Sequence, residues 1–205
     1  GNTGTSSIIL TQAALLTASA TATNVTCNGA NNGTATATGT GGCAPYMYRW
    51  SNNATTQAVS GLRPGTYMVT ITDGYGCTAT ASAKVTQPSR LVADAGSHQV
   101  VYPAYAPQAC ATLVGTASGG TPAYTAVWRM GNGVVLGTGL SISVCPTATT
   151  VYYLTVTDAN GCTARDSVAV CPRNISCGNN MVQICHTVPG RRPYSQTQCV
   201  NVAVV

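Results

Sequence analysis

Residues 66–79 read T-Y-M-V-T-I-T-D-G-Y-G-C-T-A, and residues 151–164 read V-Y-Y-L-T-V-T-D-A-N-G-C-T-A. Each stretch alternates in its first half and then meets Asp, Gly and Cys at the same spacing. Alternation with a period of two is typical of a half-buried β-strand, and an Asp followed by Gly favours a tight turn. The two stretches therefore predict the same β-hairpin, once in each half of the chain.

A second pair of matching stretches lies upstream of these hairpins. Residues 41–50 read G-G-C-A-P-Y-M-Y-R-W, and residues 119–128 read G-G-T-P-A-Y-T-A-V-W. Self-similarity at this spacing predicts two related units of about eighty residues each. We expect Trp50 and Trp128 to be the core anchors of two immunoglobulin-like β-sandwiches, because short alternating strands separated by frequent turns are typical of that fold.

The composition favours an all-β protein and excludes several functional classes. Only 6% of the 205 residues are charged and the formal net charge is +5, while Thr, Val and Tyr, which favour strands, are common. The basic residues are scattered, so we expect no binding to nucleic acid. No apolar run reaches the length of about twenty residues that a transmembrane helix needs, so we expect the chain not to span a membrane.

Ten cysteines indicate a protein that is secreted and acts outside the cell or at the cell surface. No C-x-x-C pair occurs, and an even number of dispersed cysteines is typical of disulfides formed in an oxidising compartment. Cys27 and Cys77, on an early and a late strand, could join the two sheets of the first unit, and Cys110 and Cys162 hold the same places in the second. The remaining predicted pairs are Cys185–Cys199, Cys145–Cys171 and, by elimination, Cys43–Cys177, with an intermolecular bond of Cys43 as the alternative.

The first unit resembles the SprB-type repeat of giant surface adhesins of Bacteroidota. The resemblance rests on V-T-C-N-G-A-N-N-G-T, G-G-C-A-P-Y-M-Y-R-W and G-L-R-P-G-T-Y-M-V-T-I-T-D-G-Y-G-C. Residues 91–172 resemble the PKD/Ig-like modules that accompany such repeats, and residues 173–205 resemble a short cysteine-containing segment that follows them. The resemblance implies export, by the type IX route, and a role as a spacer or adhesive module without catalytic residues.

These patterns divide the chain into four parts: an N-terminal strand at 1–17, a SprB-like sandwich at 18–90, a PKD/Ig-like sandwich at 91–172 and a cysteine-containing tail at 173–205. The N-terminal strand is unusual, because residues 7–18 (S-I-I-L-T-Q-A-A-L-L-T-A) align with residues 82–93 (S-A-K-V-T-Q-P-S-R-L-V-A), the end of the first unit and its linker.

Three explanations of the N-terminal strand remain open. The chain could be part of a longer tandem array, or the strand could pair within its own chain. Alternatively Ile8, Ile9 and Leu10 could be donated to an open sheet edge of a neighbouring subunit. A contact of that kind does not close on itself, so it would build a head-to-tail homopolymer.

The sequence gives little support for an enzyme, a cofactor or a metal site. The four acids are Asp73, Asp94, Asp158 and Asp166, and turns explain two of them. His186, beside Cys185, could bind a metal with Cys177 or Cys199, but a disulfide between Cys185 and Cys199 is the simpler explanation. Calcium binding by loop aspartates would need paired acids, which the sequence does not provide.

The sequence allows two roles for carbohydrate, as a bound ligand and as a covalent modification of the chain. The rival function is a monomeric sugar-binding adhesin module, in which the loop residues Tyr102, Tyr105 and Tyr194 would stack on surface glycans. Glycans could also be attached to the chain. Ser167 lies in a D-S-V sequence, the pattern for O-glycosylation that the resemblance implies, and Asn24, Asn32, Asn53 and Asn174 begin N-x-S/T sequons.

Overall fold

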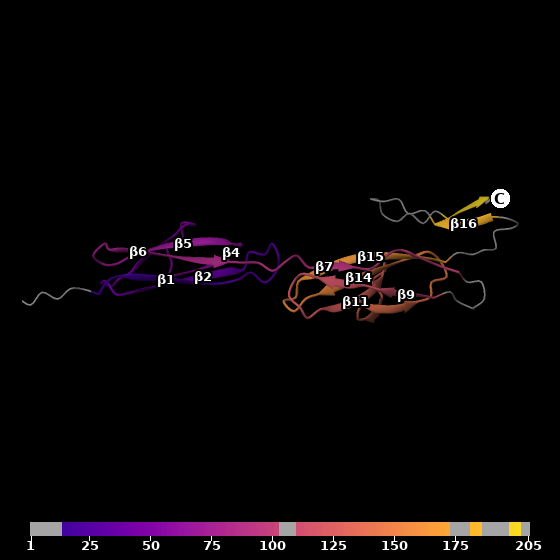
Figure 1. Cartoon of the computed structure of the whole chain (residues 1–205), viewed down its shortest axis with the longest axis horizontal. Helices are drawn as coiled ribbons and strands as arrows, with labels where there is room; N and C mark the ends of the chain where they lie inside the picture. Colours follow the sequence, from indigo (N-terminus) through magenta and orange to yellow (C-terminus); the bar gives the residue numbers. More distant parts are fainter. Residues whose placement is uncertain (1–13, 103–109, 173–180, 186–196, 202–205) are drawn as a thin grey trace, which may run out of the picture. The chain divides into compact units, whose positions relative to one another are not determined.

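The computed structural model describes residues 14–102 and 110–172, and the backbone of two further strands at 181–185 and 197–201 (Figure 1). Every regular element in these ranges is a β-strand. The chain divides into two compact units, Gly1–Pro88 and Ser89–Val205, so that the boundary follows Pro88. The all-β class and the tandem sandwich architecture are those predicted from the alternating strands.

Unit 1 is a sandwich of two three-stranded antiparallel sheets. One sheet has the order β1-β2-β4 and the other β3-β5-β6. The strands are β1 (Thr17–Thr23), β2 (Gly33–Thr40), β3 (Met47–Trp50), β4 (Ala58–Leu62), β5 (Gly65–Thr72) and β6 (Thr78–Val85).

The core of unit 1 follows from the alternation along its strands. Val69 and Ile71 on β5 are fully buried, while Ala35 and Ala37 on β2 face them from the other sheet. Trp50 ends β3 at 1% exposure, and its indole Nε1 donates to the carbonyl oxygen of Thr56 at 2.9 Å. The tryptophan therefore fills the space between the two sheets and has a partner for its polar atom.

Hydroxyl groups cover the outer face of β1 and β2. Thr17 pairs with Thr40 across the two strands, and Thr23 pairs with Thr34. Their Oγ1 atoms lie 2.6 Å apart in both pairs. Such cross-strand hydroxyl pairs stabilise a sheet without charged side chains. The outer face of this sheet therefore needs few charged residues.

Unit 2 is a larger sandwich with the same plan. Its main sheet has the order β12-β11-β14-β15-β8, in which β8 runs parallel to β15, and the pairs β13-β9 and β10-β7 complete the unit. The strands are β7 (Val92–Asp94), β8 (Gln99–Val101), β9 (Ala111–Val114), β10 (Thr116–Ser118), β11 (Thr125–Met130), β12 (Val135–Thr138), β13 (Ser141–Val144), β14 (Thr150–Thr157) and β15 (Thr163–Pro172).

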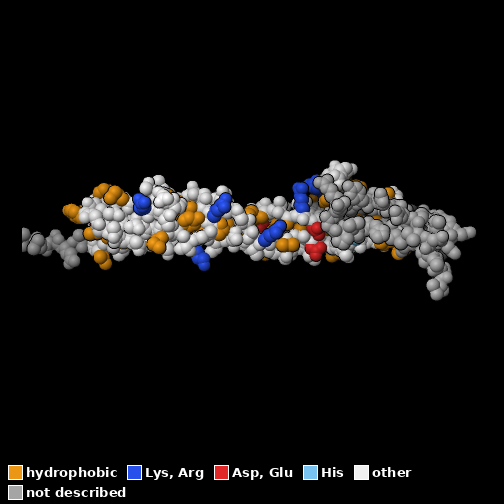
Figure 2. Space-filling model, turned by 90° about the horizontal axis from the view of Figure 1, so that it is seen from above, with side chains coloured by type: hydrophobic (Ala, Val, Ile, Leu, Met, Phe, Trp, Pro, Cys, Tyr) orange, Lys and Arg blue, Asp and Glu red, His pale blue; other side chains and the backbone are white. Residues whose placement is uncertain are grey.

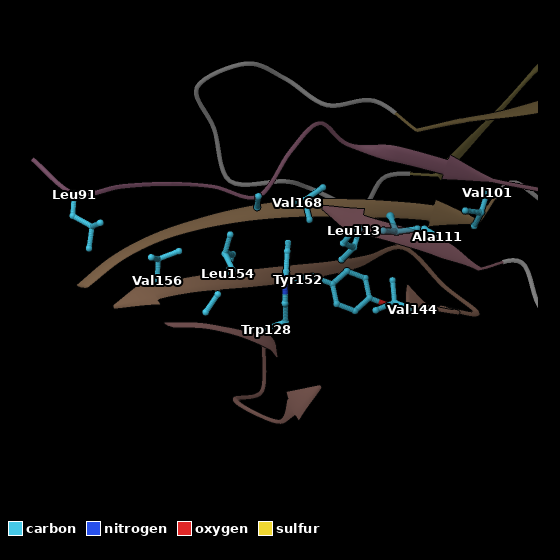
Figure 3. Packing of buried hydrophobic residues seen from close by; sticks show 13 residues of the cluster. Leu91, Val101, Ala111, Leu113, Trp128, Val144, Tyr152, Leu154, Val156 and Val168 are labelled. Atoms are coloured by element: carbon cyan, nitrogen blue, oxygen red, sulfur yellow. The ribbon is translucent and has the colours of Figure 1, made fainter. Parts of the chain in front are cut away.

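The core of unit 2 is built around Trp128, which is fully buried. Figure 3 shows Trp128 and Tyr152 beside Leu154 and Val156, with Leu113 entering from β9. Leu113, Leu154 and Val156 have no exposed surface. Unlike Trp50, Trp128 has no hydrogen-bond partner for its Nε1 among the residues that the structure describes.

A short hairpin follows the second sandwich. Strands β16 (Met181–Cys185) and β17 (Thr197–Asn201) are antiparallel, with Cys185 opposite Thr197 and Cys199 opposite Gln183. The register thus places the two cysteines two positions apart on adjacent strands. The predicted bond between Cys185 and Cys199 stays a prediction.

Candidate functional site

The turn between β5 and β6 is organised by the buried carboxylate of Asp73, which is 2% exposed. Its Oδ1 accepts the backbone N–H groups of Tyr75 at 3.0 Å and Cys77 at 2.8 Å. Its Oδ2 accepts the backbone N–H of Cys43, on the segment before β3, at 3.1 Å. We call this arrangement the Asp73 turn; it fixes a hairpin and ties it to a second loop.

Unit 2 repeats the arrangement around Asp158, which is 5% exposed. Oδ1 of Asp158 accepts from Asn160 and Cys162 at 2.9 Å each, and Oδ2 accepts from Thr121 at 2.9 Å. In this Asp158 turn, Thr121 therefore stands where Cys43 stands in unit 1, and Cys162 stands where Cys77 stands.

These contacts lower the pKa of both carboxyl groups. Burial is the largest single influence on the pKa of Asp73 and raises it, but the hydrogen bonds from Cys77, Cys43 and Tyr75 together outweigh burial. For Asp158 the backbone N–H of Thr121 is the largest cause and lowers the pKa, while burial opposes it. Both groups are therefore ionised at neutral pH and act as acceptors in the fold.

Each turn also contacts the segment that leads into its unit, at residues 14–16 in unit 1 and residues 89–91 in unit 2. The N–H of Gly42 donates to the carbonyl oxygen of Ala14 at 2.7 Å, and the N–H of Gly120 donates to that of Ser89 at 3.0 Å. A Cβ atom on Gly42 or Gly120 would lie 2.6 Å from Oδ2 of the aspartate in its turn, and both residues have φ near +60° (61° and 59°). Only glycine fits this position, because it combines a left-handed backbone with close approach of a carboxylate.

A tyrosine braces each of these loops from the core side. The hydroxyl of Tyr46 donates to the carbonyl oxygen of Gly41 at 2.5 Å, and that of Tyr124 donates to Gly119 at 2.6 Å. Leu16 in unit 1 and Leu91 in unit 2 are buried beside the incoming segments, at 7% and 8% exposure. The alignment of residues 14–16 with 89–91 thus extends to matching hydrogen bonds and matching burial.

The cysteines pair differently from the sequence-based prediction. Cys110 is bonded to Cys145, so the predicted pairs Cys110–Cys162 and Cys145–Cys171 are wrong. The two residues extend the antiparallel pair β9–β13, in which Ala111 lies opposite Val144. Cys171 is a buried thiol, whose sulfur accepts from Oγ1 of Thr149 at 3.6 Å.

The predicted bond between Cys27 and Cys77 is also wrong, because Cys77 is an exposed thiol. The Cys27 loop is held at the end of β6, where Val25 donates to the carbonyl of Thr86 at 3.1 Å. Cys77 lies at the start of the same strand, and eight residues of β6 span about 26 Å, far beyond the separation of about 7 Å that a disulfide can bridge. Cys27 and Cys162 are each disulfide-bonded. Cys43 is a half-buried free thiol, so the predicted pair Cys43–Cys177 is wrong as well.

The two remaining aspartates and His98 also serve the fold. Oδ1 of Asp94 accepts the N–H of Gly96, and Oδ2 of Asp166 accepts that of Ala95, both at 2.8 Å. Nδ1 of His98 accepts the N–H of Ala169 at 2.8 Å, which fixes a strand rather than a ligand. Within the described ranges, no group of three or more His, Cys, Asp or Glu side chains could hold a metal ion.

The candidate glycosylation residues differ in how accessible they are. Asn53 is exposed in a turn with φ of 68°, and Asn24 is exposed although its Oδ1 accepts the N–H of Thr86. The amide of Asn32 is bonded to both Oγ1 and N of Thr26. Ser167 is half-buried in the middle of β15, opposite Tyr153. Glycan attachment at all four stays a prediction.

Several predicted residues lie outside the described part of the chain: Ile8, Ile9, Leu10, Tyr105, Asn174, Cys177, His186 and Tyr194. Of the candidate sugar-stacking residues, Tyr102 is described and is 55% exposed. Figure 2 shows isolated basic and acidic side chains on a face made mostly of uncharged groups. Among the described elements there is no helix with the length and hydrophobicity needed to cross a bilayer.

The sequence pattern predicts Asp73 and Asp158 only as turn residues. Their long-range acceptor role, and the glycines that allow it, emerge from the structure. The signal was present, since the Gly-Gly pairs at 41–42 and 119–120 occupy matching places in the repeat. The Gly-Gly pairs do not reveal which group approaches each glycine, because that depends on how the loops pack.

Comparison with known proteins supports the repeat and the fold. The SprB repeat family matches residues 19–55, and no curated protein sequence matches the chain. Among solved structures, the three N-terminal domains of the highly immunogenic outer capsid protein (Hoc) of bacteriophage RB49 give a TM-score of 0.54 at 18% identity. That match covers 82% of this chain, which spans 63% of the Hoc fragment.

Two further solved structures are also similar to the chain, with lower scores. An I-band fragment of titin gives a TM-score of 0.39 at 12% identity and covers 80% of this chain and 67% of its own. Eight immunoglobulin domains of Down syndrome cell adhesion molecule give 0.38 at 18% identity, with coverage of 78% and 24%. The comparisons identify a SprB repeat at residues 19–55, and the similarity to the Hoc domains supports the tandem sandwich fold across most of the chain.

Proposed function

We propose that this chain is a structural segment of an extracellular surface fibre or adhesin. The SprB repeat at residues 19–55, the immunoglobulin-like sandwiches and the disulfide between Cys110 and Cys145 all support a protein that works outside the cell. The four aspartates and His98 each accept a backbone hydrogen bond, which favours a structural role for these groups over a catalytic one.

One observation carries the proposal. Ala14 and Leu16 occupy in unit 1 the places that Ser89 and Leu91 occupy in unit 2, with the same hydrogen bond from a glycine. In unit 2 that segment is the connection from a preceding sandwich. Unit 1 therefore has the features of a module that follows another module in a row.

A second part of the proposal concerns how successive copies of the chain are joined. Ile8, Ile9 and Leu10 complete a sheet of a neighbouring copy, and successive copies form a head-to-tail homopolymer. Because the first unit resembles SprB repeats, we also propose that the chain comes from a member of the Bacteroidota and is exported by the type IX route. We further propose that its uncharged surface carries glycans.

Negative-stain electron microscopy of the intact chain tests the assembly. It is compared with a variant that lacks residues 1–12, which keeps Ala14–Leu16, and with a full-length variant in which Ile8, Ile9 and Leu10 are all replaced by Asp. We expect filaments from the intact chain and isolated particles from both variants. A control with Val100→Asp, at an exposed position 47% accessible, should still form filaments.

Filaments in all samples would contradict strand donation and leave the structural role standing. Isolated particles from the intact chain at high concentration would contradict the homopolymer. In that case a glycan array with the intact chain and a Tyr102→Ala variant becomes the decisive test. Saturable binding that the variant loses would replace the structural proposal with the sugar-binding module.

A further inference from the structure

The Asp73 turn carries a thiol at a position that the second unit uses for a disulfide. Cys77 is exposed and unbonded, while its counterpart Cys162 is disulfide-bonded. We propose that Cys77 forms a disulfide with a cysteine of a second copy of this chain, so that neighbouring copies are joined covalently. This inference rests on the proposed function, because it adds a covalent link to the proposed assembly.

The equivalence of the two positions is detailed. The N–H of Cys77 donates to Oδ1 of Asp73 at 2.8 Å, and that of Cys162 donates to Oδ1 of Asp158 at 2.9 Å. In the reverse direction, Asp73 N–H donates to the carbonyl of Cys77 at 2.9 Å, and Asp158 N–H donates to that of Cys162 at 3.0 Å. The same backbone therefore holds both cysteines at the tip of the hairpin.

The two other thiols of the described residues are poorer candidates. Cys171 is 6% exposed within the core of unit 2, so a partner from another chain cannot reach its sulfur. Cys43 is half-buried, and its counterpart in unit 2 is Thr121, which forms no disulfide. The repeat therefore singles out Cys77 as the linking position.

The cysteines that are already bonded or buried are excluded as partners of Cys77. Cys27, Cys110, Cys145 and Cys162 are disulfide-bonded, and Cys171 is buried. Cys77 lies in the turn that also receives Ala14–Leu16, so its thiol is exposed at the end of unit 1 where a preceding module would join. The proposed head-to-tail assembly places a second copy at that end, and peptide mapping identifies which of its cysteines is bonded to Cys77.

The bond forms by thiol–disulfide exchange with a small-molecule disulfide such as oxidised glutathione. The Cys77 thiolate attacks the disulfide and releases one glutathione thiolate, leaving a mixed disulfide on Cys77. A thiolate of the second copy then attacks the Cys77 sulfur and releases the second glutathione. Two protein thiols lose two electrons and two protons overall, and one oxidised glutathione becomes two reduced molecules.

The test uses the full chain, incubated at high concentration with reduced and oxidised glutathione, quenched with N-ethylmaleimide and separated on non-reducing gels. The variants are Cys77→Ser, Cys43→Ser and, as the matched control for removal of one thiol, Cys171→Ser. Circular dichroism establishes that each variant folds, and peptide mapping by mass spectrometry identifies the partner of Cys77.

We expect dimers and larger species from the intact chain, Cys43→Ser and Cys171→Ser, and a loss of at least tenfold in these species for Cys77→Ser. Cross-linked species that persist in Cys77→Ser, or a monomer with an internal Cys43–Cys77 bond, would overturn the inference. Filaments in which Cys77 remains alkylatable would also overturn it while the proposed assembly stands. Absence of both filaments and cross-links would contradict the two proposals together.

Discussion

The backbone N–H of Thr121 donates to Oδ2 of Asp158 at 2.9 Å and thereby joins two loops that are 37 residues apart in the sequence. The same carboxylate closes its own hairpin through Asn160 and Cys162. One side chain thus fixes both a local turn and the long-range position of the loop that precedes β11.

Replacing this carboxylate tests its structural role. We expect Asp158→Asn to lower the melting temperature of unit 2 by several degrees, because an amide has one acceptor oxygen and its NH2 group would face an N–H donor. Asp94→Asn is the matched control, since Asp94 accepts one local N–H, from Gly96, at an exposed site. Equal melting temperatures for the two variants in a thermal scan would argue against the role assigned to Asp158.

The lowered pKa values of Asp73 and Asp158 predict how the stability of the fold depends on pH. The pKa values of Asp73 and Asp158 are lower in the folded state than in the unfolded chain, where Asp titrates near pH 4. The stabilisation is therefore fully present above about pH 4 and is lost as the pH falls through the folded pKa values.

Melting temperatures measured from pH 7 to pH 2 check this expectation. The intact chain should lose stability in the acid limb, and the double variant Asp73→Asn/Asp158→Asn should show a flatter profile there. If the melting temperature of the double variant falls equally steeply at acid pH, groups other than these two aspartates cause the loss of stability.

The two core tryptophans provide a matched comparison. Trp50→Ala and Trp128→Ala should each cost about 3–5 kcal/mol, as expected for a large buried aromatic side chain. Trp50→Phe should cost more than Trp128→Phe, because it removes the hydrogen bond to Thr56 and leaves that carbonyl without its donor. Chemical denaturation of the four variants gives the free energies, and the reverse order for the two Phe variants would contradict the comparison.

The disulfide between Cys110 and Cys145 should stabilise unit 2 mainly by restricting its unfolded state. The two residues are separated by 35 positions, a loop for which loss of the bond costs about 3–4 kcal/mol. We expect Cys110→Ser/Cys145→Ser to lower the unfolding free energy by about this amount. Cys171→Ser, which alters a buried thiol outside any bond, is the control, and a double variant as stable as the intact chain would refute the expectation.

The sequence alone determined the local structure of this protein. Alternation along 66–72 and 151–157 is a property of neighbouring residues, and so is the Asp-to-Gly spacing of each hairpin. These features predicted the strands and the tandem sandwiches. They also singled out Trp50 and Trp128, both of which lie at the centre of a core, at 1% and 0% exposure.

The tertiary structure decided which distant residues meet. The bond between Cys110 and Cys145 depends on β9 pairing with β13, a choice that no local pattern encodes. The long-range acceptor role of Asp73 likewise depends on the loop that brings Cys43 to its Oδ2. Local sequence sets the backbone of each turn, but packing of the two sheets decides which thiol and which N–H lie within a few ångströms of it.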